Sequence, residues 1–449
     1  MSRLTSSMLI LFFSHTLLAQ QSLLQSGPMV GYGTMTEVMV WAQTTRAASV
    51  QVQYWEPPTP KQKFKSRIFK TREDEGFTAH VLVDGLQPGK QFEFELLLDG
   101  KVTKRLYPYR FQTQPLWQWR TDPPAFTVAF GSCNYVNEPE WDRPGKPYGS
   151  DHEIFERIAD QKPDVMLWLG DNTYYREIEF GSLRGLIHRQ THTRSLPELQ
   201  RLLGIAHHYA IWDDHDFGPD NSDRSWRLKD EVLRVHKMFW ANQTYGTDEI
   251  RGTFGRFEWD DVEFFLLDDR YHRSPDSTPD DAAKTMFGKP QLQWLKDALL
   301  NSRAPFKMVV NGNQILNRLA PEEVLADFPA EWEELIGFIK KERIRGVVFL
   351  SGDRHITELI VHRDSTFYPL YDFTSSAFTA GLSPPRGKEI DMKDRVAGTL
   401  VADAHTFGLL KFSGPRTDRK LTMETWDHTG KLRWTFELKA RDLQPPQGE

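Results

Sequence analysis

Six short apolar segments in the second part of this chain are each followed by polar side chains, and this arrangement narrows the possible folds most. The segments are residues 126–130, 165–169, 209–212, 262–267, 308–310 and 347–350. Helical patterns alternate with them at 151–161, 196–204, 225–240, 290–301 and 330–343, which predicts an α/β sheet with helices on its faces. Binding sites in such sheets lie at the carboxyl ends of the strands, so the polar residues are expected to converge on one site.

The first part of the chain has a different periodicity. Apolar residues alternate with polar ones along 27–114, as at Val38, Val40 and Ala42, and turn residues such as Pro88-Gly89 separate the runs. This predicts a small β-sandwich that resembles a fibronectin type III domain and acts as a scaffold or spacer. We expect the sandwich over 20–114, a linker over 115–125, a second domain over 126–438 and a loose tail over 439–449.

Residues 1–19 have the pattern of an export signal peptide. Arg3 precedes a short apolar run at 8–13, and cleavage is expected between Ala19 and Gln20. The run is too short to span a bilayer, and no other stretch approaches that length. We therefore expect an exported protein, periplasmic or secreted, without a membrane span.

The composition is that of a globular protein, with 39% apolar and 26% charged residues. The chain has 56 basic and 62 acidic residues and lacks a block of five or six basic residues, which argues against a nucleic-acid scaffold. Its single cysteine, Cys133, excludes a disulfide within the chain. That thiol is therefore either buried and inert or used for chemistry.

The residues at the strand ends are of the types that bind metal ions. They are Cys133, Asp171, Tyr174, Asp213, Asp214, His215, Asp216, Asp353 and His355. Carboxylates suit Ca²⁺, Mg²⁺ or Mn²⁺, whereas imidazole, thiolate and phenolate suit iron or zinc. Asp171, directly behind Gly170, is the candidate to bridge two ions, an arrangement that serves phosphate ester hydrolysis.

Each of these residues also has a structural interpretation. Cys133 fits a small buried side chain, Asp171 a helix cap and Tyr174 a core aromatic. Arg270 and Arg273 fit structural ion pairs. The succession of ligand types after so many strands favours a common site over these separate explanations.

The motifs resemble those of the PhoD-like (alkaline phosphatase D) family of calcineurin-like metallophosphoesterases, related to purple acid phosphatases. The matching segments are Gly170-Asp171 with Tyr174, Cys133 upstream, Trp212-Asp213-Asp214-His215-Asp216, Leu267-Asp268-Asp269-Arg270 with Arg273, a helix with Gly288, Gln291, Trp294 and Leu295, and Gly352-Asp353-Arg354-His355. The resemblance covers about 125–412. Many members carry a twin-arginine signal, whereas this chain has only Arg3, so export by the general secretory route is expected.

The resemblance implies a four-layer α/β/β/α sandwich with a two-metal centre, most often Fe³⁺ with Ca²⁺, although Mn²⁺, Zn²⁺ or Mg²⁺ are alternatives. Cys133, Asp171 and Tyr174 would hold the iron with Asp353 or His355, and Asp171 would bridge. Asp214 would serve the second ion with His215 or Asp353. Asn221 is a weaker candidate, and the segment 216–220 departs from the bacterial alkaline phosphatase pattern, which points to a different substrate.

The expected function is hydrolysis of small phosphomonoesters or phosphodiesters by a metal-activated hydroxide. His215 or His355 would protonate the leaving oxygen, and Arg176 or Arg354 would hold a phosphate oxygen. The alternatives are a phospholipase D-type phosphodiesterase acting on lipid head groups and a catalytically silent, metal-stabilised binding protein. A zinc peptidase is disfavoured because the chain has no H-E-x-x-H motif.

Overall fold

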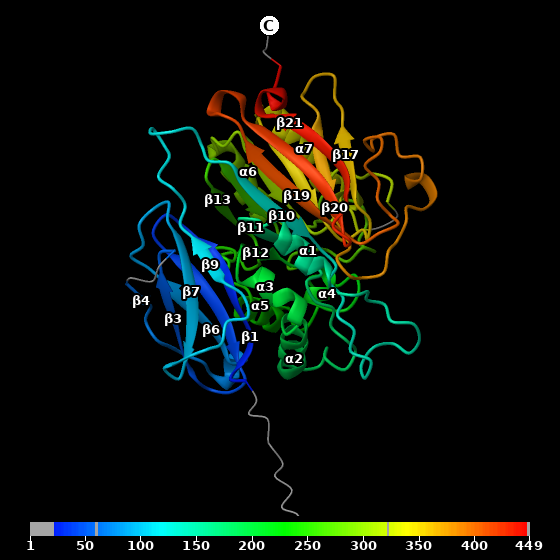
Figure 1. The fold of residues 1–449 in the computed structure, drawn as a ribbon. Coiled ribbons are helices and arrows are strands. Elements are labelled where there is room, and N and C mark those ends of the chain that lie inside the picture. The colour runs from blue at the N-terminus through cyan, green and yellow to red at the C-terminus, as the bar shows by residue number, and fades with distance from the viewer. Residues whose placement is uncertain (1–21, 59–61, 321–322, 447–449) are drawn as a thin grey trace, which may run out of the picture.

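The computed structural model describes residues 22–58, 62–320 and 323–446, so the expected signal peptide at 1–19 lies outside the described residues. Two large β-sheets face each other and helices cover their outer faces (Figure 1). This arrangement confirms the α/β/β/α sandwich, and the β-rich first part agrees with the expected small β-sandwich.

The first sheet has nine strands in the order β21-β20-β19-β10-β11-β12-β1-β2-β6. Their bounds are β1 Leu24–Gly33, β2 Val38–Thr44, β6 Thr78–Val83, β10 Phe126–Gly131, β11 Val165–Leu169, β12 His207–Ile211, β19 Thr406–Ser413, β20 Lys420–Asp427 and β21 Leu432–Lys439. Strands β10, β11 and β12 are parallel neighbours, so their carboxyl ends lie at the same edge.

The second sheet has six strands in the order β13-β14-β15-β16-β18-β17. Their bounds are β13 Gly255–Trp259, β14 Val262–Leu266, β15 Phe306–Val310, β16 Val347–Ser351, β17 Glu358–His362 and β18 Leu370–Thr374. Strands β14, β15 and β16 are also parallel neighbours. In each sheet, therefore, three adjacent parallel strands end at the same edge, and the polar loops identified in the sequence follow directly from these ends.

Helices bury the outer faces of both sheets. They are α1 Ile154–Asp160, α2 Leu183–Arg194, α3 Pro197–Leu203, α4 Asp214–Phe217, α5 Lys229–Phe239, α6 Lys289–Asn301 and α7 Pro329–Lys341. In β11, Val165 and Leu167 belong to the core that includes the other sheet, whereas Met166 and Trp168 belong to the core that includes α1, α3 and α5. A strand buried on both faces gives a continuous apolar run in the sequence.

The first part of the chain packs a smaller sheet against β1, β2 and β6. The strands of this smaller sheet are β3 Ser49–Trp55, β4 Phe64–Lys65, β5 Phe69–Lys70, β7 Gln91–Leu98, β8 Lys101–Val102 and β9 Tyr109–Gln112. Strand β1 also pairs with β12 through Val30 and His207, so the nine-stranded sheet continues from one part of the chain into the other. The division into domains at 115–125 stays a prediction.

The expected loose tail is partly ordered. Residues Ala440–Leu443 form a short 3-10 helix, Leu443 is 1% exposed, and its carbonyl accepts from the Gly346 N–H at 2.9 Å. Residues 447–449 lie outside the described residues, and the tail as a separate segment stays a prediction. Among the described residues, no helix has the length and apolar character needed to cross a membrane.

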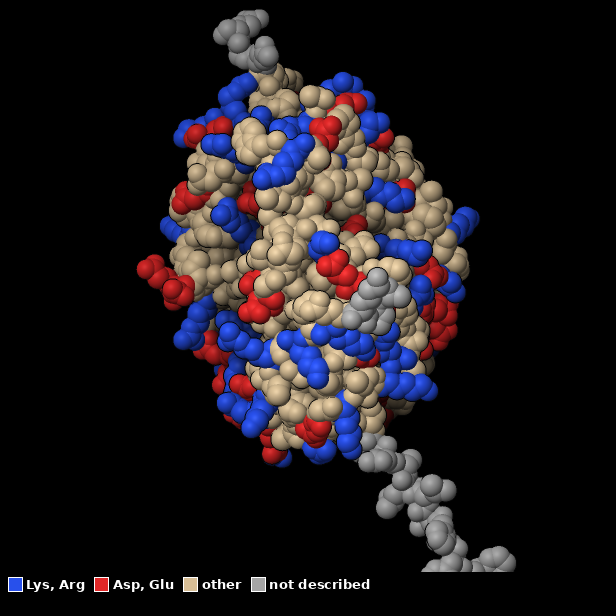
Figure 2. All heavy atoms as spheres, turned by 60° about the vertical axis from the view of Figure 1, so that its left-hand side comes forward, with Lys and Arg blue, Asp and Glu red and all other residues tan. Residues whose placement is uncertain are grey.

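The surface carries both signs of charge. Figure 2 brings the side of the N-terminal strands forward, and Lys and Arg side chains gather over the lower part of that face with Asp and Glu side chains among them. This mixed distribution agrees with the composition.

Candidate metal centre

The polar loops of the two sheets meet at one place. Cys133 follows β10, Asp171 follows β11, and Asp213 to His215 follow β12. Asp353 and His355 follow β16 of the facing sheet. The peptide N–H of Asp353 donates to the Ser132 hydroxyl at 3.1 Å, which ties the loop after β16 to the loop after β10.

A first group of ligand atoms surrounds a single point. One ligand atom each of Cys133, Asp171 and His355 lie within 4.8 Å of one another. The Cys133 Sγ is 3.5 Å from Asp171 Oδ2, and the Tyr174 hydroxyl donates to that same oxygen at 2.9 Å. The hydroxyl also lies 3.2 Å from His355 Nε2, so thiol, carboxyl, phenol and imidazole converge.

A second group shares one residue with the first. It consists of Asp171, Asp214 and His215, again with ligand atoms within 4.8 Å of one another. The Asp214 Oδ1 is buried and has no hydrogen-bond partner, whereas its Oδ2 accepts from the Asn221 N–H at 2.7 Å. Asp171 is therefore the residue that the two groups have in common, which is the position expected of a bridging carboxylate.

The backbone holds these side chains in an unusual conformation. The φ angles of Cys133, Asp171, Asp353 and His355 are 61°, 50°, 62° and 55°, in the left-handed region that non-glycine residues seldom adopt. Such conformations persist where the surrounding structure over-determines them, and they cluster at functional sites. Gly170 is required at its position, because a Cβ there would lie 2.5 Å from the Asp213 Cβ.

The acidic side chains of the cluster are buried close together, and without a cation their charged forms are disfavoured. Burial raises the pKa of Asp171 well above its usual range, and neighbouring Asp214 raises it further. Burial and then Asp171 raise the pKa of the Cys133 thiol. Burial also raises the pKa of Asp353, to about 7. Bound cations reverse this and favour the ionised ligands, so the donor set fits metal ions.

Contacts at Nδ1, the ring nitrogen that faces away from Asp171 and Tyr174, fix the orientation of the His355 ring. Its Nδ1 lies 2.6 Å from the Gly381 carbonyl and 3.2 Å from the Tyr148 hydroxyl. A proton on Nδ1 that is donated to the carbonyl leaves Nε2 as the ligand atom, facing Asp171 and Tyr174. This is the usual way in which a second hydrogen bond fixes the tautomer of a metal-binding histidine.

A buried ion-pair network supports the segment that carries Asp214 and His215. Arg270 is fully buried, its Nε donates to Asp213 Oδ1 at 2.6 Å, and its Nη2 pairs with Glu323 at 2.6 Å. Asn313 donates to Asp213 at 3.1 Å, and Arg273 donates to Asn313 at 3.0 Å. Arg270 and Asn313 thus hold Asp213 in a structural network, and the contacts of Arg270 and Arg273 agree with their interpretation as structural residues.

The two arginines predicted to hold a phosphate oxygen, Arg176 and Arg354, both have partners within the protein. The Arg176 guanidinium is buried in contacts with Asp142 (2.7 Å), the Val136 carbonyl (2.9 Å) and the Tyr135 ring. A phosphate could reach it only by breaking these contacts, which disfavours the phosphate role of Arg176; that role stays a prediction. Arg354 pairs with Glu389 at 3.0 Å, and its phosphate role stays a prediction.

Asp353 approaches the first group through its backbone carbonyl. Its carbonyl oxygen is 3.5 Å from the Cys133 Sγ, and the two groups of ligand atoms do not include its side chain. His355 belongs to the first group by its side chain, and the choice between Asp353 and His355 as a ligand of the first ion stays a prediction. Glu323 and Tyr148, which the sequence analysis missed, also belong to the surroundings of the site, Glu323 through Arg270 and Tyr148 through His355.

Comparisons with known proteins agree with this geometry. The family model described as PhoD-like phosphatase matches residues 129–388, and one described as Domain of unknown function (DUF7800) matches residues 21–116. Alkaline phosphatase D of Bacillus subtilis (strain 168) is 22% identical over 366 residues, which cover 68% of this chain and 58% of that protein. The chain thus spans less than two thirds of that relative's length.

Two solved structures share the fold. A structure of PhoD superposes with a TM-score of 0.73 at 17% identity, covering 94% of this chain and 93% of that one. A purple acid phosphatase from yellow lupin (Lupinus luteus) superposes with a TM-score of 0.66 at 12% identity, covering 93% of this chain and 76% of that one. With the family model spanning more than half of its residues, the chain belongs to the PhoD-like phosphatase family.

Proposed function

We propose that this chain is an exported, metal-dependent phosphoesterase that hydrolyses small phosphomonoesters or phosphodiesters. The observation that carries the proposal is the shared position of Asp171 between two ligand groups, one with Cys133 and His355 and the other with Asp214 and His215. The family membership supports the same reaction class. A decayed, silent binding protein would not be expected to keep both groups complete.

The two groups differ in the ions they suit. Cys133, Asp171, Tyr174 and His355 would hold an ion that accepts thiolate, phenolate and imidazole, for which we propose Fe³⁺. Asp171 and Asp214, with Asp353, would hold the second, for which we propose Ca²⁺, with Mn²⁺, Zn²⁺ or Mg²⁺ as alternatives, and this leaves the adjacent His215 for proton transfer. Such ions, when bound, neutralise charge on phosphate oxygens and lower the pKa of water.

His215 is the better placed of the two histidines to protonate the leaving oxygen. Its side chain is 26% exposed, and its Nε2 faces Asp220 at 3.5 Å and Asp214 at 3.9 Å. The ring rests on Tyr174 with centroids 4.2 Å apart, which fixes its orientation. The Nδ1 of His355 is held by Gly381, and its Nε2 faces the first ligand group, so that ring is committed to binding.

The direct test is hydrolysis of a chromogenic phosphomonoester and a chromogenic phosphodiester by full chain purified without chelator. Turnover of either ester, with metal content measured by elemental analysis, is the expected result, and the preferred ester defines the substrate class. Phosphatidylcholine vesicles as a third substrate test the phospholipase D-type alternative. Absence of turnover with both metals bound would reject the phosphoesterase and favour the binding protein.

Metal removal is expected to destabilise the protein. Without cations the buried carboxyls of Asp171 and Asp214 face each other and the Cys133 thiol, and ligands that bind only the folded state add stability by mass action. For a chain of this size the thermal midpoint should fall by about 3–10 °C in chelator. The measurement is scanning calorimetry with and without chelator, and an unchanged midpoint after proven metal loss would contradict the metal assignment.

Export is proposed from the segment 1–19 and is tested separately. Fractionation of the producing cells should place the protein outside the cytoplasm, with a mature chain that begins at Gln20. A full-length chain starting at Met1 in the cytoplasm would contradict this part of the proposal without touching the activity.

A further inference from the structure

A pocket lies at the amino ends of strands in the second sheet, whereas the metal centre lies at their carboxyl ends. Its volume is about 640 Å³, and its lining includes Val262 and Pro305, at the amino ends of β14 and β15. Strand β14 runs five residues from there toward the metal-centre loops, a distance of roughly 16 Å at about 3.3 Å per residue. A hollow of this volume falls within the range that holds small organic ligands.

Two arginines of this pocket lack partners. Among the described residues, the guanidinium groups of Arg303 and Arg345 make no ion pair and no hydrogen bond. Other arginines of the lining are paired, Arg419 with Asp261 at 2.7 Å and Arg441 with Asp418 at 3.6 Å. The pocket therefore carries positive charge that the described chain does not neutralise, which suits an anionic group such as phosphate.

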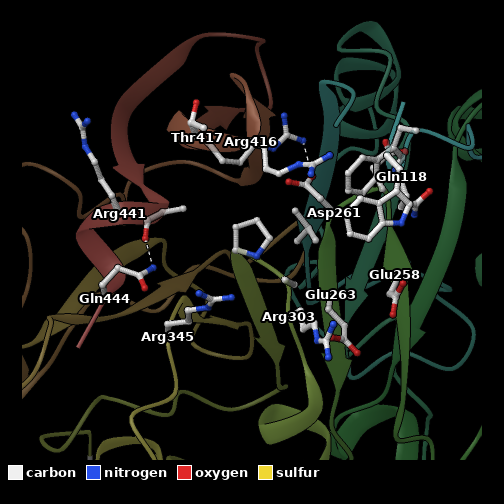
Figure 3. A pocket seen from close by; sticks show the side chains of 18 residues that line it. Gln118, Glu258, Asp261, Glu263, Arg303, Arg345, Arg416, Thr417, Arg441 and Gln444 are labelled. Atoms are coloured by element: carbon white, nitrogen blue, oxygen red, sulfur yellow. Dashed lines mark hydrogen bonds and ion pairs between the residues drawn. The ribbon is translucent and has the colours of Figure 1, made fainter. Parts of the chain in front are cut away.

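The opposite side of the pocket carries unneutralised negative charge. Glu258 and Glu263 face each other across strands β13 and β14, and like charges directly opposite are unfavourable. Arg256 pairs with Glu263 at 3.1 Å, whereas Glu258 has no cationic partner among the described residues. In Figure 3, Glu258 and Arg345 lie on opposite sides of the hollow. A ligand that complements both sides must have hydrogen-bond donors at one end and an anion at the other.

The third feature is aromatic. Trp119 is 91% exposed, and Trp117 lies under the Arg416 guanidinium with 5.6 Å to the ring centroid. The Nε1 of Trp117 and the Oε1 of Gln118 are buried without hydrogen-bond partners, so the chain itself does not complete this wall. Tryptophan faces exposed beside charged groups serve as stacking platforms for planar rings.

We propose that this pocket binds a nucleoside monophosphate whose base carries an exocyclic amino group. The base stacks on Trp119, the amino group donates to the Glu258 carboxylate, and the phosphate accepts from Arg303 and Arg345. Inorganic phosphate alone would leave Trp119 and Glu258 unused, and a neutral sugar would leave both guanidinium groups without an anion. This site is separate from the metal centre and does not depend on the proposed hydrolysis.

The experiment measures binding to the full chain that carries Asp171→Asn, whatever its metal content, so that the nucleotides are not consumed. The probes are adenosine, cytidine and uridine monophosphates and inorganic phosphate, followed by calorimetry and tryptophan fluorescence. Adenosine and cytidine monophosphates should bind at least about fivefold more tightly than uridine monophosphate, which lacks the amino group. Quenching of tryptophan fluorescence should accompany binding.

Variants assign the binding to the pocket. In the same background, Trp119→Ala should weaken adenosine monophosphate binding at least about fivefold. The double change Arg303→Gln with Arg345→Gln should weaken it at least about tenfold. A matched double change at two other arginines with exposed side chains, Arg46→Gln with Arg184→Gln, should leave it unaltered.

Three results would overturn the proposal. One is that none of the nucleotides binds, and another is that inorganic phosphate binds as tightly as they do. The third is nucleotide binding that survives all pocket changes, which would place it at the metal centre. Circular dichroism of each variant confirms that a loss of binding is not a loss of fold.

Discussion

Replacement of Asp171 by asparagine should abolish most turnover of phosphate esters while the fold is kept. Asp171 is the residue common to both ligand groups, and its Oδ2 accepts from Tyr174 at 2.9 Å while its Oδ1 accepts from the His215 N–H at 3.2 Å. Asparagine keeps one acceptor oxygen but loses the charge that two cations share. Loss of one such electrostatic group typically costs about 10²–10³-fold in rate, and loss of an ion costs more.

The fold should tolerate this change because the carboxylate is poorly placed for stability in the absence of metal. Burial and the neighbouring Asp214 disfavour its charged form, so a neutral amide of the same shape relieves that repulsion. The chelator-treated variant is therefore expected to melt no lower than the chelator-treated parent. Turnover, thermal midpoint and metal content are measured on the same preparations.

The matched control is Asp151→Asn, at an exposed aspartate outside both ligand groups. It should keep the turnover, the metal content and the midpoint of the parent. Full turnover by the Asp171 variant with both metals still bound would contradict the bridging assignment. A variant that loses metal and turnover together, with an intact fold, agrees with it.

The strands that position the site were predictable because both faces of each are buried. Residues 165–169 form a continuous apolar run in the sequence and a fully buried strand in the structure, and Asp171 follows it in both. The same reasoning located Cys133, Asp214 and His355, since parallel neighbours bring their carboxyl ends together. Helix α2 was missed, because its buried face includes Arg189, Gln190, Thr193 and Arg194, so that no apolar period marks it.

Some contacts of the site and of the sheets join residues far apart in the sequence, and no local sequence pattern predicts them. Glu323 lies in a loop 53 residues along the chain from Arg270, and only the tertiary fold brings the two side chains together. The pairing of β1 with β12 joins residues that are 177 positions apart, so the sequence favoured two separate sheets. Arg176 is close to Tyr174 in sequence, but sequence proximity does not reveal what a side chain binds, and its guanidinium is held by Asp142 and by the backbone carbonyls of Tyr174 and Val136.

Replacement of Arg270 by leucine should give the largest loss of stability among changes outside the ligand groups. The guanidinium is fully buried between Asp213 and Glu323, with contacts of 2.6 Å from Nε to Asp213 and from Nη2 to Glu323. Leucine leaves both carboxyls without a counter-charge in a buried environment. Breaking a buried pair in this way typically costs about 3–5 kcal/mol of the free energy of unfolding.

The effect should extend to the site, because Asp213 caps the short helix that carries Asp214 and His215. Its side chain accepts from the Asp214 N–H at 2.9 Å, so a displaced Asp213 disturbs the second ligand group. Turnover by Arg270→Leu should therefore fall even in the fraction that stays folded. Arg270→Lys keeps the charge but not the fork that reaches Asp213 and Glu323 together, and it should fall between leucine and the parent.

The comparison that isolates burial is Arg46→Leu, which removes a 64% exposed arginine paired with Asp99, itself 42% exposed, at 3.2 Å. Surface pairs of this kind contribute about 0–1 kcal/mol, so the urea midpoint of that variant should stay close to the parent's. Urea unfolding of the metal-loaded proteins, followed by tryptophan fluorescence, measures both. Equal midpoints for the two leucine variants would mean that Asp213 and Glu323 avoid the cost of a buried unpaired charge, either by taking up protons or by moving into solvent. The network would then not be what holds the segment of Asp214 and His215 in place.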